Sequence, residues 1–127
     1  MSVKQAIIIR KDLKMRRGKE IAQGSHASQA WLLKRFKGGD EDTSYVRLNP
    51  LEREWLDSGT KKIVLQVESE TDIVNLHDHA KQLGLEANLI VDHGLTEFGG
   101  VPTITALAIG PAKDEAIDSI TGKLKLY

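Results

Sequence analysis

Residues 10–19 of this chain read RKDLKMRRGK, a stretch in which six of ten residues are Lys or Arg. The whole 127-residue chain is neutral, with 18 Lys+Arg against 18 Asp+Glu, so this positive charge is a local feature. Helix-like sequence follows from Gly18, and the free backbone N–H groups of a helix N-terminus favour an anion. The pattern predicts an anion site, and six charges suit a polymer such as RNA better than a small anion. An ordinary solvated basic loop is the alternative.

Asp92 is a second residue with chemical potential, because it follows a short apolar stretch that is typical of a strand. An Asp at a strand end with a Gly nearby is by default a turn former. It gains a chemical role if Lys19 approaches it, because a Lys–Asp pair keeps the carboxylate ionised as a base and stabilises developing negative charge. Thr96 and Thr103 can add hydroxyl hydrogen bonds, although ordinary strand propensity also explains Thr103.

The remaining polar residues point away from metal or thiol chemistry. The chain has no Cys, which excludes a disulfide framework, a Cys-ligated zinc site and a thiol nucleophile. His77 and His79 lie two apart on an expected helix and therefore point in different directions. His26 is either a packed core residue or a supporting group of the site, and a role for His93 beside Asp92 has no further support. No metal-binding, phosphate-loop or nucleophile-elbow motif is present, so we expect chemistry without a metal or cofactor.

Apolar, β-branched stretches and helical stretches follow one another along the chain. The expected strands are residues 3–9, 62–67, 87–91 and 103–109, and the expected helices are residues 18–37, 50–58, 69–83 and 111–121. Helical crossovers predict that the first three strands are parallel, whereas the third and fourth can pair either way. We therefore predict a three-layer α/β domain with a small four-stranded mixed β-sheet flanked by helices on both faces. Ligands bind beyond the carboxyl ends of such strands, where the basic stretch and Asp92 are expected to meet.

Two further segments complete this arrangement. Residues 38–48 are polar and acidic, and we expect them to form an exposed loop. The apolar tail at residues 124–127 is expected to add an edge strand or to cover the core.

The length and composition indicate a single domain, residues 1–127, with 40% hydrophobic and 28% charged residues. No stretch approaches the ~20 apolar residues of a membrane span. The apolar run near the N-terminus is shorter than the roughly 7–15 residues of a signal-peptide core. We therefore expect a cytoplasmic protein without membrane contact.

Short motifs in a fixed order extend over nearly the whole chain. They are DLKM at 12–15, GK at 18–19, AQ at 22–23, SHA at 25–27, KKIVL at 61–65, QLGL at 82–85, Asp92 with Gly94 and Thr96, AIGP at 108–111, and ID at 117–118 followed by TGKLKL at 121–126. With these motifs the chain resembles the type 2 peptidyl-tRNA hydrolases of archaea and eukaryotes. The resemblance implies a four-stranded mixed sheet, commonly a homodimer, and hydrolysis of the ester between a peptide and the 3′ ribose of tRNA without a metal.

The resemblance also implies roles for individual residues. The family's catalytic residues fall on Lys19, Asp92, Thr96 and Thr103, and in the implied mechanism Asp92 activates or orients a water. The residues implied for binding peptidyl-tRNA are Arg10, Lys11, Lys14, Arg16, Arg17, Gln23 and His26. In this scheme the basic residues hold tRNA phosphates, and no cofactor is involved.

Several positions depart from the family pattern. Leu95 and Glu97 stand where the family usually has Arg and Gln, and Gly24 stands where Cys is common. Val101-Pro102-Thr103 replaces the usual Pro-Gly-Thr. The four retained catalytic residue types favour an enzyme. Leu95 and Glu97 favour the alternatives, which are a non-catalytic or differently specific tRNA- or RNA-binding module, or a protein whose basic loop meets an acidic partner protein.

Overall fold

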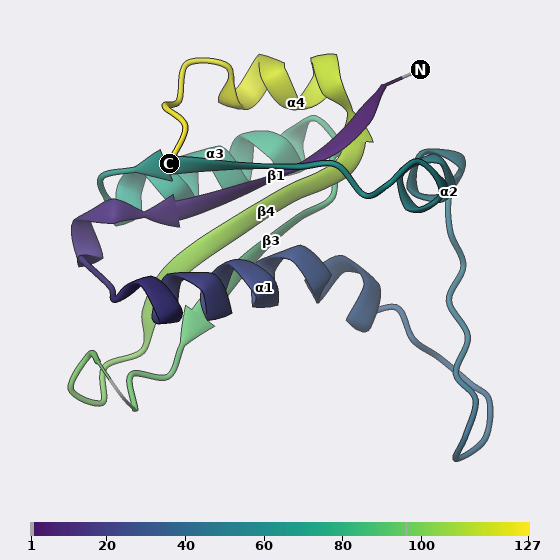
Figure 1. The fold of residues 1–127 in the computed structure, drawn as a ribbon, viewed down its shortest axis with the longest axis horizontal. Helices are drawn as coiled ribbons and strands as arrows, with labels where there is room; N and C mark the ends of the chain where they lie inside the picture. Colours follow the sequence, from purple (N-terminus) through teal and green to yellow (C-terminus); the bar gives the residue numbers. More distant parts are fainter. Residues whose placement is uncertain (1, 96) are drawn as a thin grey trace.

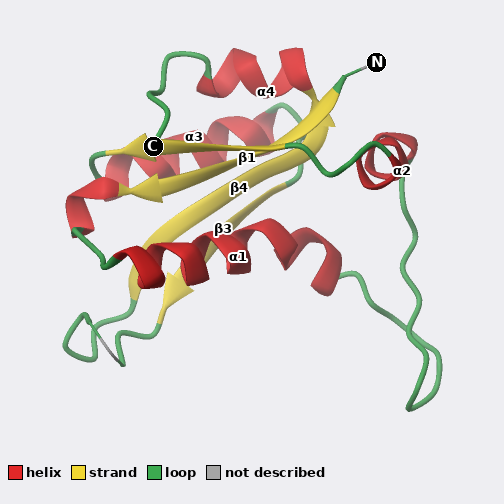
Figure 2. Cartoon of the chain, in the orientation of Figure 1, coloured by secondary structure: helices red, strands yellow, loops and turns green. Residues whose placement is uncertain are grey.

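A computed structural model of the chain describes residues 2–95 and 97–127 (Figures 1 and 2). Its strands are β1 (Val3–Arg10), β2 (Lys62–Val67), β3 (Ala87–Asp92) and β4 (Thr103–Lys113). They form a four-stranded sheet in the order β2-β1-β4-β3, in which β1 and β2 are parallel and β4 is antiparallel to both β1 and β3. The first three strands therefore run in the same direction, as predicted, and the pairing of β3 with β4, which the sequence left open, is antiparallel.

Helices cover both faces of this sheet, as the sequence predicts. They are α1 (Arg17–Leu33), α2 (Pro50–Asp57), α3 (Glu70–Gln82) and α4 (Asp114–Thr121), with a short 3-10 helix, η1 (Lys11–Leu13), after β1. Ile7 and Ile9 of β1 point to the core under α1, whereas Ala6 and Ile8 point to the core under α3 and α4, because neighbouring residues of a strand face opposite sides. Thus α1 forms one outer layer, and α3 with α4 forms the other (Figure 1).

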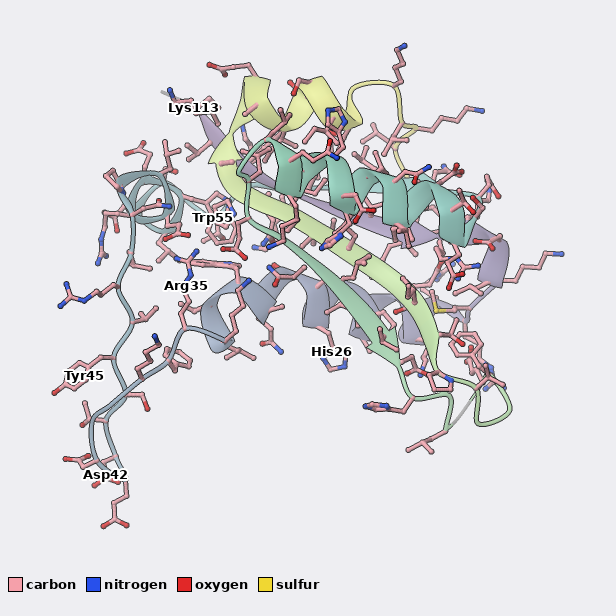
Figure 3. All side chains as sticks on the ribbon, turned by 180° about the vertical axis from the view of Figure 1, so that it is seen from behind. His26, Arg35, Asp42, Tyr45, Trp55 and Lys113 are labelled. Carbon is pink, nitrogen blue, oxygen red and sulfur yellow. The ribbon has the colours of Figure 1, made fainter. Side chains whose placement is uncertain are left out.

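The C-terminal end of α1 is tied to α2 and β3 by buried groups. The Trp31 ring packs edge-on against Trp55, with the ring centroids 6.1 Å apart. Arg35 lies near Trp55 (Figure 3). Its guanidinium donates to the carboxylates of Glu52 and Glu86, each at 2.6 Å. Glu52 is fully buried and also completes the N-terminal capping box of α2. Arg35 is therefore the cationic partner of a buried carboxylate.

The last helix begins later than predicted, at Asp114 and not at Pro111. β4 continues through a cis Gly110-Pro111 bond, and Ala112 and Lys113 still pair with β1. Strand pairing here outweighs the preference of Pro for the first turn of a helix. The first turn of α4 instead begins with an acidic residue, which suits the positive end of the helix dipole.

α1 ends earlier than predicted, at Leu33, where the chain turns so that Arg35 reaches its two carboxylates. The acidic segment that follows is an exposed hairpin closed by the pairing of Lys37 with Tyr45, which agrees with the predicted loop (Figure 3). The C-terminal tail pairs Leu126 antiparallel with a residue of β2. The tail therefore extends the sheet edge, which was one of its two predicted roles.

Candidate active site

Lys19 and Asp92 come together at the edge of the sheet where β1 and β3 end. Lys19 lies in the first turn of α1, and Asp92 is the last residue of β3. The Lys19 Nζ atom donates to Asp92 Oδ1 at 2.7 Å. Both side chains are largely shielded from solvent, with 15% and 13% of their surfaces exposed. The condition that the sequence analysis set for Asp92, the approach of Lys19, is therefore met.

Further donors hold the Asp92 carboxylate in place. The backbone N–H of Gly94 donates to Oδ2 at 2.8 Å, and the side-chain amide of Gln23 donates to Oδ1 at 3.4 Å. The hydrogen bond from Lys19 lowers the pKa of the Asp92 carboxyl below its ordinary value of 3.8, the Gly94 bond adds to this effect, and burial opposes it. Asp92 is therefore both ionised at neutral pH and fixed in orientation.

Removal of the Lys19 ammonium is expected to raise the pKa of Asp92, because its hydrogen bond is the largest cause of the lowering and burial remains as the opposing effect. In the wild type, the stabilisation that this carboxylate gives the fold is present above about pH 3.8 and is lost as the pH falls through the lower folded pKa. Carboxyl-carbon NMR titration of Lys19→Ala and wild type measures the shift, with Lys14→Ala as a control for loss of a lysine. Equal Asp92 pKa values in wild type and Lys19→Ala would contradict the assigned cause.

Thr105 contacts the site and was missed by the sequence analysis. It is fully buried in β4, and its hydroxyl donates to Gln23 Oε1 at 2.5 Å. With its oxygen occupied in this way, the Gln23 amide presents its NH2 group to Asp92. Thr103, which the resemblance favoured, instead donates to the backbone oxygen of Val101 in its own loop. The available signal for Thr105 was the two-residue period of a strand, which places it on the same face as Thr103.

A cleft of about 400 Å³ opens beside Asp92. Its lining residues are Gln23, His26 and Leu89, Ile90, Val91, Asp92 and His93. His26 is exposed at the rim of this cleft (Figure 3). Phe98, also missed by the sequence analysis, places its ring centroid 5.9 Å from Lys19 Nζ, a cation–π contact. Thr96, which the resemblance assigns to the site, lies outside the described residues.

The basic stretch divides into one buried residue and several exposed ones. Arg10 is buried, and its guanidinium donates to Asp12 and to the carbonyl oxygen of Ile104 in β4. It therefore fastens the loop to the sheet and does not face the surface where a phosphate would lie. The exposed residues are Lys11, Lys14, Arg16 and Arg17, which we name the basic loop. Met15 is buried in the core between them, so the basic loop is anchored on both sides.

Comparison with known proteins decides the family. The family described as Peptidyl-tRNA hydrolase PTH2 matches residues 3–127. The chain belongs to this family. A peptidyl-tRNA hydrolase of Pyrobaculum aerophilum is 42% identical over 128 residues, which cover 100% of this chain and 99% of that protein. One of Methanocaldococcus jannaschii is 42% identical over 98% of this chain and 99% of its own length. The probable peptidyl-tRNA hydrolase 2 of Dictyostelium discoideum is 40% identical over 98% of this chain and 54% of its own length.

Glu97, one of the departures from the PTH2 pattern, lies next to the basic loop. Its carboxylate approaches the Arg16 guanidinium at 3.5 Å. Glu97 therefore places negative charge beside the surface that the resemblance assigns to tRNA. Leu95, the other departure in this segment, is 87% exposed, and no contact among the described residues explains it.

Glu97→Gln is expected to tighten tRNA binding about two- to fivefold at low salt, because a carboxylate no longer competes for the basic loop. The slope of log affinity against log salt concentration should steepen by about one, since one more cation meets phosphate. Fluorescence titrations of tRNA over a salt series measure both quantities. The control is Glu115→Gln, which removes an exposed carboxylate from α4 on the other face of the sheet. This variant should change neither the tRNA affinity nor its salt dependence. Equal tRNA affinities of Glu97→Gln and wild type would show that the Glu97 carboxylate does not compete with phosphate for the basic loop.

His77 and His79 both lie on α3, as expected. His77 Nδ1 lies 3.0 Å from the carboxylate of its neighbour Asp78. Among residues 2–95 and 97–127, no group of three or more His, Asp or Glu side chains is arranged to hold a metal ion. Over the same residues, no helix has the length and apolar character needed to cross a membrane.

Proposed function

We propose that this chain hydrolyses the ester that joins a peptide to the 3′ ribose of tRNA. The observation that carries the proposal is the shielded Lys19–Asp92 pair, which lies beside a cleft and close to the basic loop. The similarity over the full length to proteins named peptidyl-tRNA hydrolase supports it.

Asp92 and Lys19 have different tasks in the proposed reaction. Asp92 Oδ2 accepts the Gly94 N–H and has a second lone pair that can accept a water. Asp92 orients this water for attack on the ester carbonyl carbon. Because its pKa is lowered, Asp92 is a weak base and acts mainly through orientation and charge. The Lys19 ammonium stabilises the negative charge that develops on the carbonyl oxygen. The bond to the ribose oxygen then breaks, and this oxygen takes up one proton of the attacking water, which leaves a 3′-hydroxyl on tRNA. The other proton passes to solvent as the new peptide acid ionises to a carboxylate.

The surrounding residues position these groups and the substrate. Gln23, held by Thr105, keeps the Asp92 carboxylate in place. The basic loop holds tRNA phosphates through charge, and His26 contacts the substrate at the rim of the cleft. Thr96 and Thr103 stay in the proposal as hydroxyl donors to the substrate.

The test is the incubation of the wild-type protein with N-acetyl-alanyl-tRNA. We expect release of free tRNA without added metal and at an unchanged rate in EDTA, because no proposed step uses a metal ion. tRNA binding without hydrolysis would instead support the non-catalytic RNA-binding module. If the protein neither hydrolyses this substrate nor binds tRNA, the remaining alternative is a protein whose basic loop meets an acidic partner protein.

We also propose that the chain acts in the cytoplasm as a homodimer, as the family resemblance implies. A second cleft, of about 560 Å³, lies on the other flank of α1 and is largely apolar. Two of its lining residues, Ile21 and Val64, are 64% and 41% exposed, and a second copy would cover them. Sedimentation equilibrium should give twice the chain mass of 14.1 kDa. A single-chain mass at micromolar concentration would contradict the dimer.

A further inference from the structure

β3 forms an open edge of the sheet beside the catalytic pair. It is the last strand in the order β2-β1-β4-β3 and pairs with β4 on one side. Open edges of this kind are usually protected by Lys or Pro residues. β3 reads ANLIVD and contains neither, and its charged residue, Asp92, is paired with Lys19. Val91 near its end is 48% exposed. The edge is therefore suited to pair with another strand.

The ladder with β4 shows which main-chain groups of β3 face outward. Gly110 N–H donates to the carbonyl oxygen of Glu86, just before β3, and the two residues are opposite each other in the register. In an antiparallel ladder the residues alternate between those that bond across and those that face away. The even-numbered residues of β3 therefore bond to β4 as far as Ile90. The register shifts between Ile90 and Val91 because β4 has an extra residue there, Thr105. The alternation along β3 itself continues, so Leu89 and Val91 turn their N–H and C=O groups outward. Apart from the ladder, no hydrogen bond joins the main chain of Leu89 or Val91 to a described residue.

These outward groups belong to the same cleft as the catalytic carboxylate. Leu89, Val91 and Asp92 all line the cleft of about 400 Å³. At the other end of β3 the space toward α1 is closed, because Lys34 donates to Glu86 and Asn88 at 2.5 and 2.8 Å. The open part, residues 89–92, spans about 13 Å at ~3.3 Å per residue, which is room for about three or four residues of an extended peptide.

We propose that the peptide part of peptidyl-tRNA binds as an added strand on the outer edge of β3. The inference rests on the proposed hydrolase function. The carbonyl carbon of the ester belongs to the last residue of the peptide and must lie at Asp92, so the preceding residues extend back toward Leu89. The peptide therefore runs parallel to β3, and the tRNA leaves in the opposite direction, toward the basic loop.

Strand addition also answers a chemical requirement of this substrate. An enzyme that removes peptides from tRNA meets side chains of every kind, so binding through side-chain pockets would restrict it. Main-chain hydrogen bonds to an edge strand give affinity without regard to side chains. Paired in this way, the last peptide residue is also held in a fixed orientation at Lys19 and Asp92, which favours attack by the oriented water.

Two substrate series on one tRNA test the proposal. The first carries acetylated oligo-alanine of one to five residues, and kcat/KM should rise about tenfold up to three or four residues and then stay constant, as two or so hydrogen bonds are added. The second carries tetra-alanine with one backbone N-methyl group at each position in turn. Because alternate residues of a strand face its neighbour, N-methylation should lower kcat/KM about 3- to 10-fold at alternate positions and little at those between.

A variant of β3 tests the same main-chain hydrogen bonds by a change in the protein and not in the substrate. Val91→Pro removes an outward N–H, which an edge strand tolerates, whereas Val91→Thr keeps the N–H and the branched shape. The ratio of kcat/KM for tetra-alanyl to mono-alanyl substrate should fall severalfold in Val91→Pro and stay near the wild-type ratio in Val91→Thr. Circular dichroism melting curves confirm that both variants fold.

The outcomes separate this inference from the proposed function. If wild type cleaves every length with one kcat/KM, or if N-methylation acts equally at all positions, strand addition is wrong and the hydrolase function stands. That result would also be expected if a second copy of the chain occupies the β3 edge. If wild type cleaves none of the substrates, the hydrolase function is wrong and strand addition fails with it.

Discussion

Asp92→Asn and Lys19→Met are each expected to lower kcat for N-acetyl-alanyl-tRNA about 10²- to 10³-fold, which is the typical loss when a preorganised charged group is removed from a reacting centre. Asn keeps the shape of Asp92 but not its charge, and an NH2 group replaces one of the two carboxylate oxygens. Either the water or Lys19, which donates at 2.7 Å in the wild type, therefore loses its acceptor. Since the two residues act as a unit, the double variant should be little worse than either single variant. Single-turnover rates with saturating enzyme measure the chemical step directly.

The control for this prediction is Lys14→Met in the basic loop. Lys14 is exposed and lies outside the Lys19–Asp92 pair. Its loss should raise KM and weaken the salt dependence of KM while kcat stays the same, because it contributes charge to binding and not to the reacting centre. A fall in kcat for Lys14→Met as large as that for Lys19→Met would mean that Lys19 acts through loop charge alone. Full-rate hydrolysis by Asp92→Asn would remove Asp92 from the mechanism.

Arg35→Met should destabilise the fold by about 3–5 kcal/mol, the usual effect of leaving a buried charge without its partner. The Glu52 side chain is 1% exposed, and the Arg35 guanidinium is its cationic partner at 2.6 Å. Arg35 also donates to Glu86. Burial raises the pKa of Glu86, and hydrogen bonds from Lys34, Asn88 and Arg35 together lower it below its ordinary value. Urea denaturation of wild type and variant measures the loss of unfolding free energy.

Two comparisons make this stability prediction specific. Arg53→Met breaks an exposed pair with Asp57, in which the two side chains are 62% and 65% exposed, and should change the unfolding free energy by less than about 1 kcal/mol. Arg35→Met combined with Glu52→Gln should recover part of the lost stability, because the unpaired charge is then gone. If Arg35→Met and Arg53→Met lower the free energy of unfolding equally, the burial of the Glu52 carboxylate does not explain the effect of Arg35.

Some parts of the fold and site were predictable because they depend on local patterns. The β-branched run at Ile7, Ile8 and Ile9 predicted a strand buried on both faces, and the N-cap signal at Asn49-Pro50 predicted the start of α2. The rule that ligands bind beyond the carboxyl ends of strands predicted that the basic stretch and Asp92 meet, and the contact of Lys19 with Asp92 fulfils the condition set for a chemical role of Asp92. Each of these predictions needs only neighbouring residues or a general property of α/β sheets.

Other parts depend on contacts between distant residues and were not predictable in this way. The sequence signal for a helix start at Pro111 is real, but the pairing of Ala112 and Lys113 with β1 decides against it. Arg10 belongs to the basic stretch by composition, and its burial follows from a carbonyl group of β4 that is distant in the sequence. The contact of Thr105 with Gln23 likewise requires the register between α1 and β4.

β4 lies in the middle of the sheet and holds both halves of the site through neighbouring residues. The carbonyl oxygen of Ile104 accepts Arg10, which anchors the basic loop, and the Thr105 hydroxyl holds Gln23 against Asp92. Amide groups in a central strand exchange with solvent only in the most costly openings of a protein. The spacing between the basic loop and the Asp92 carboxylate is therefore part of the global cooperative unit. Local opening of the hairpin at residues 37–45 leaves that spacing intact, and the site loses its geometry only when the whole sheet unfolds.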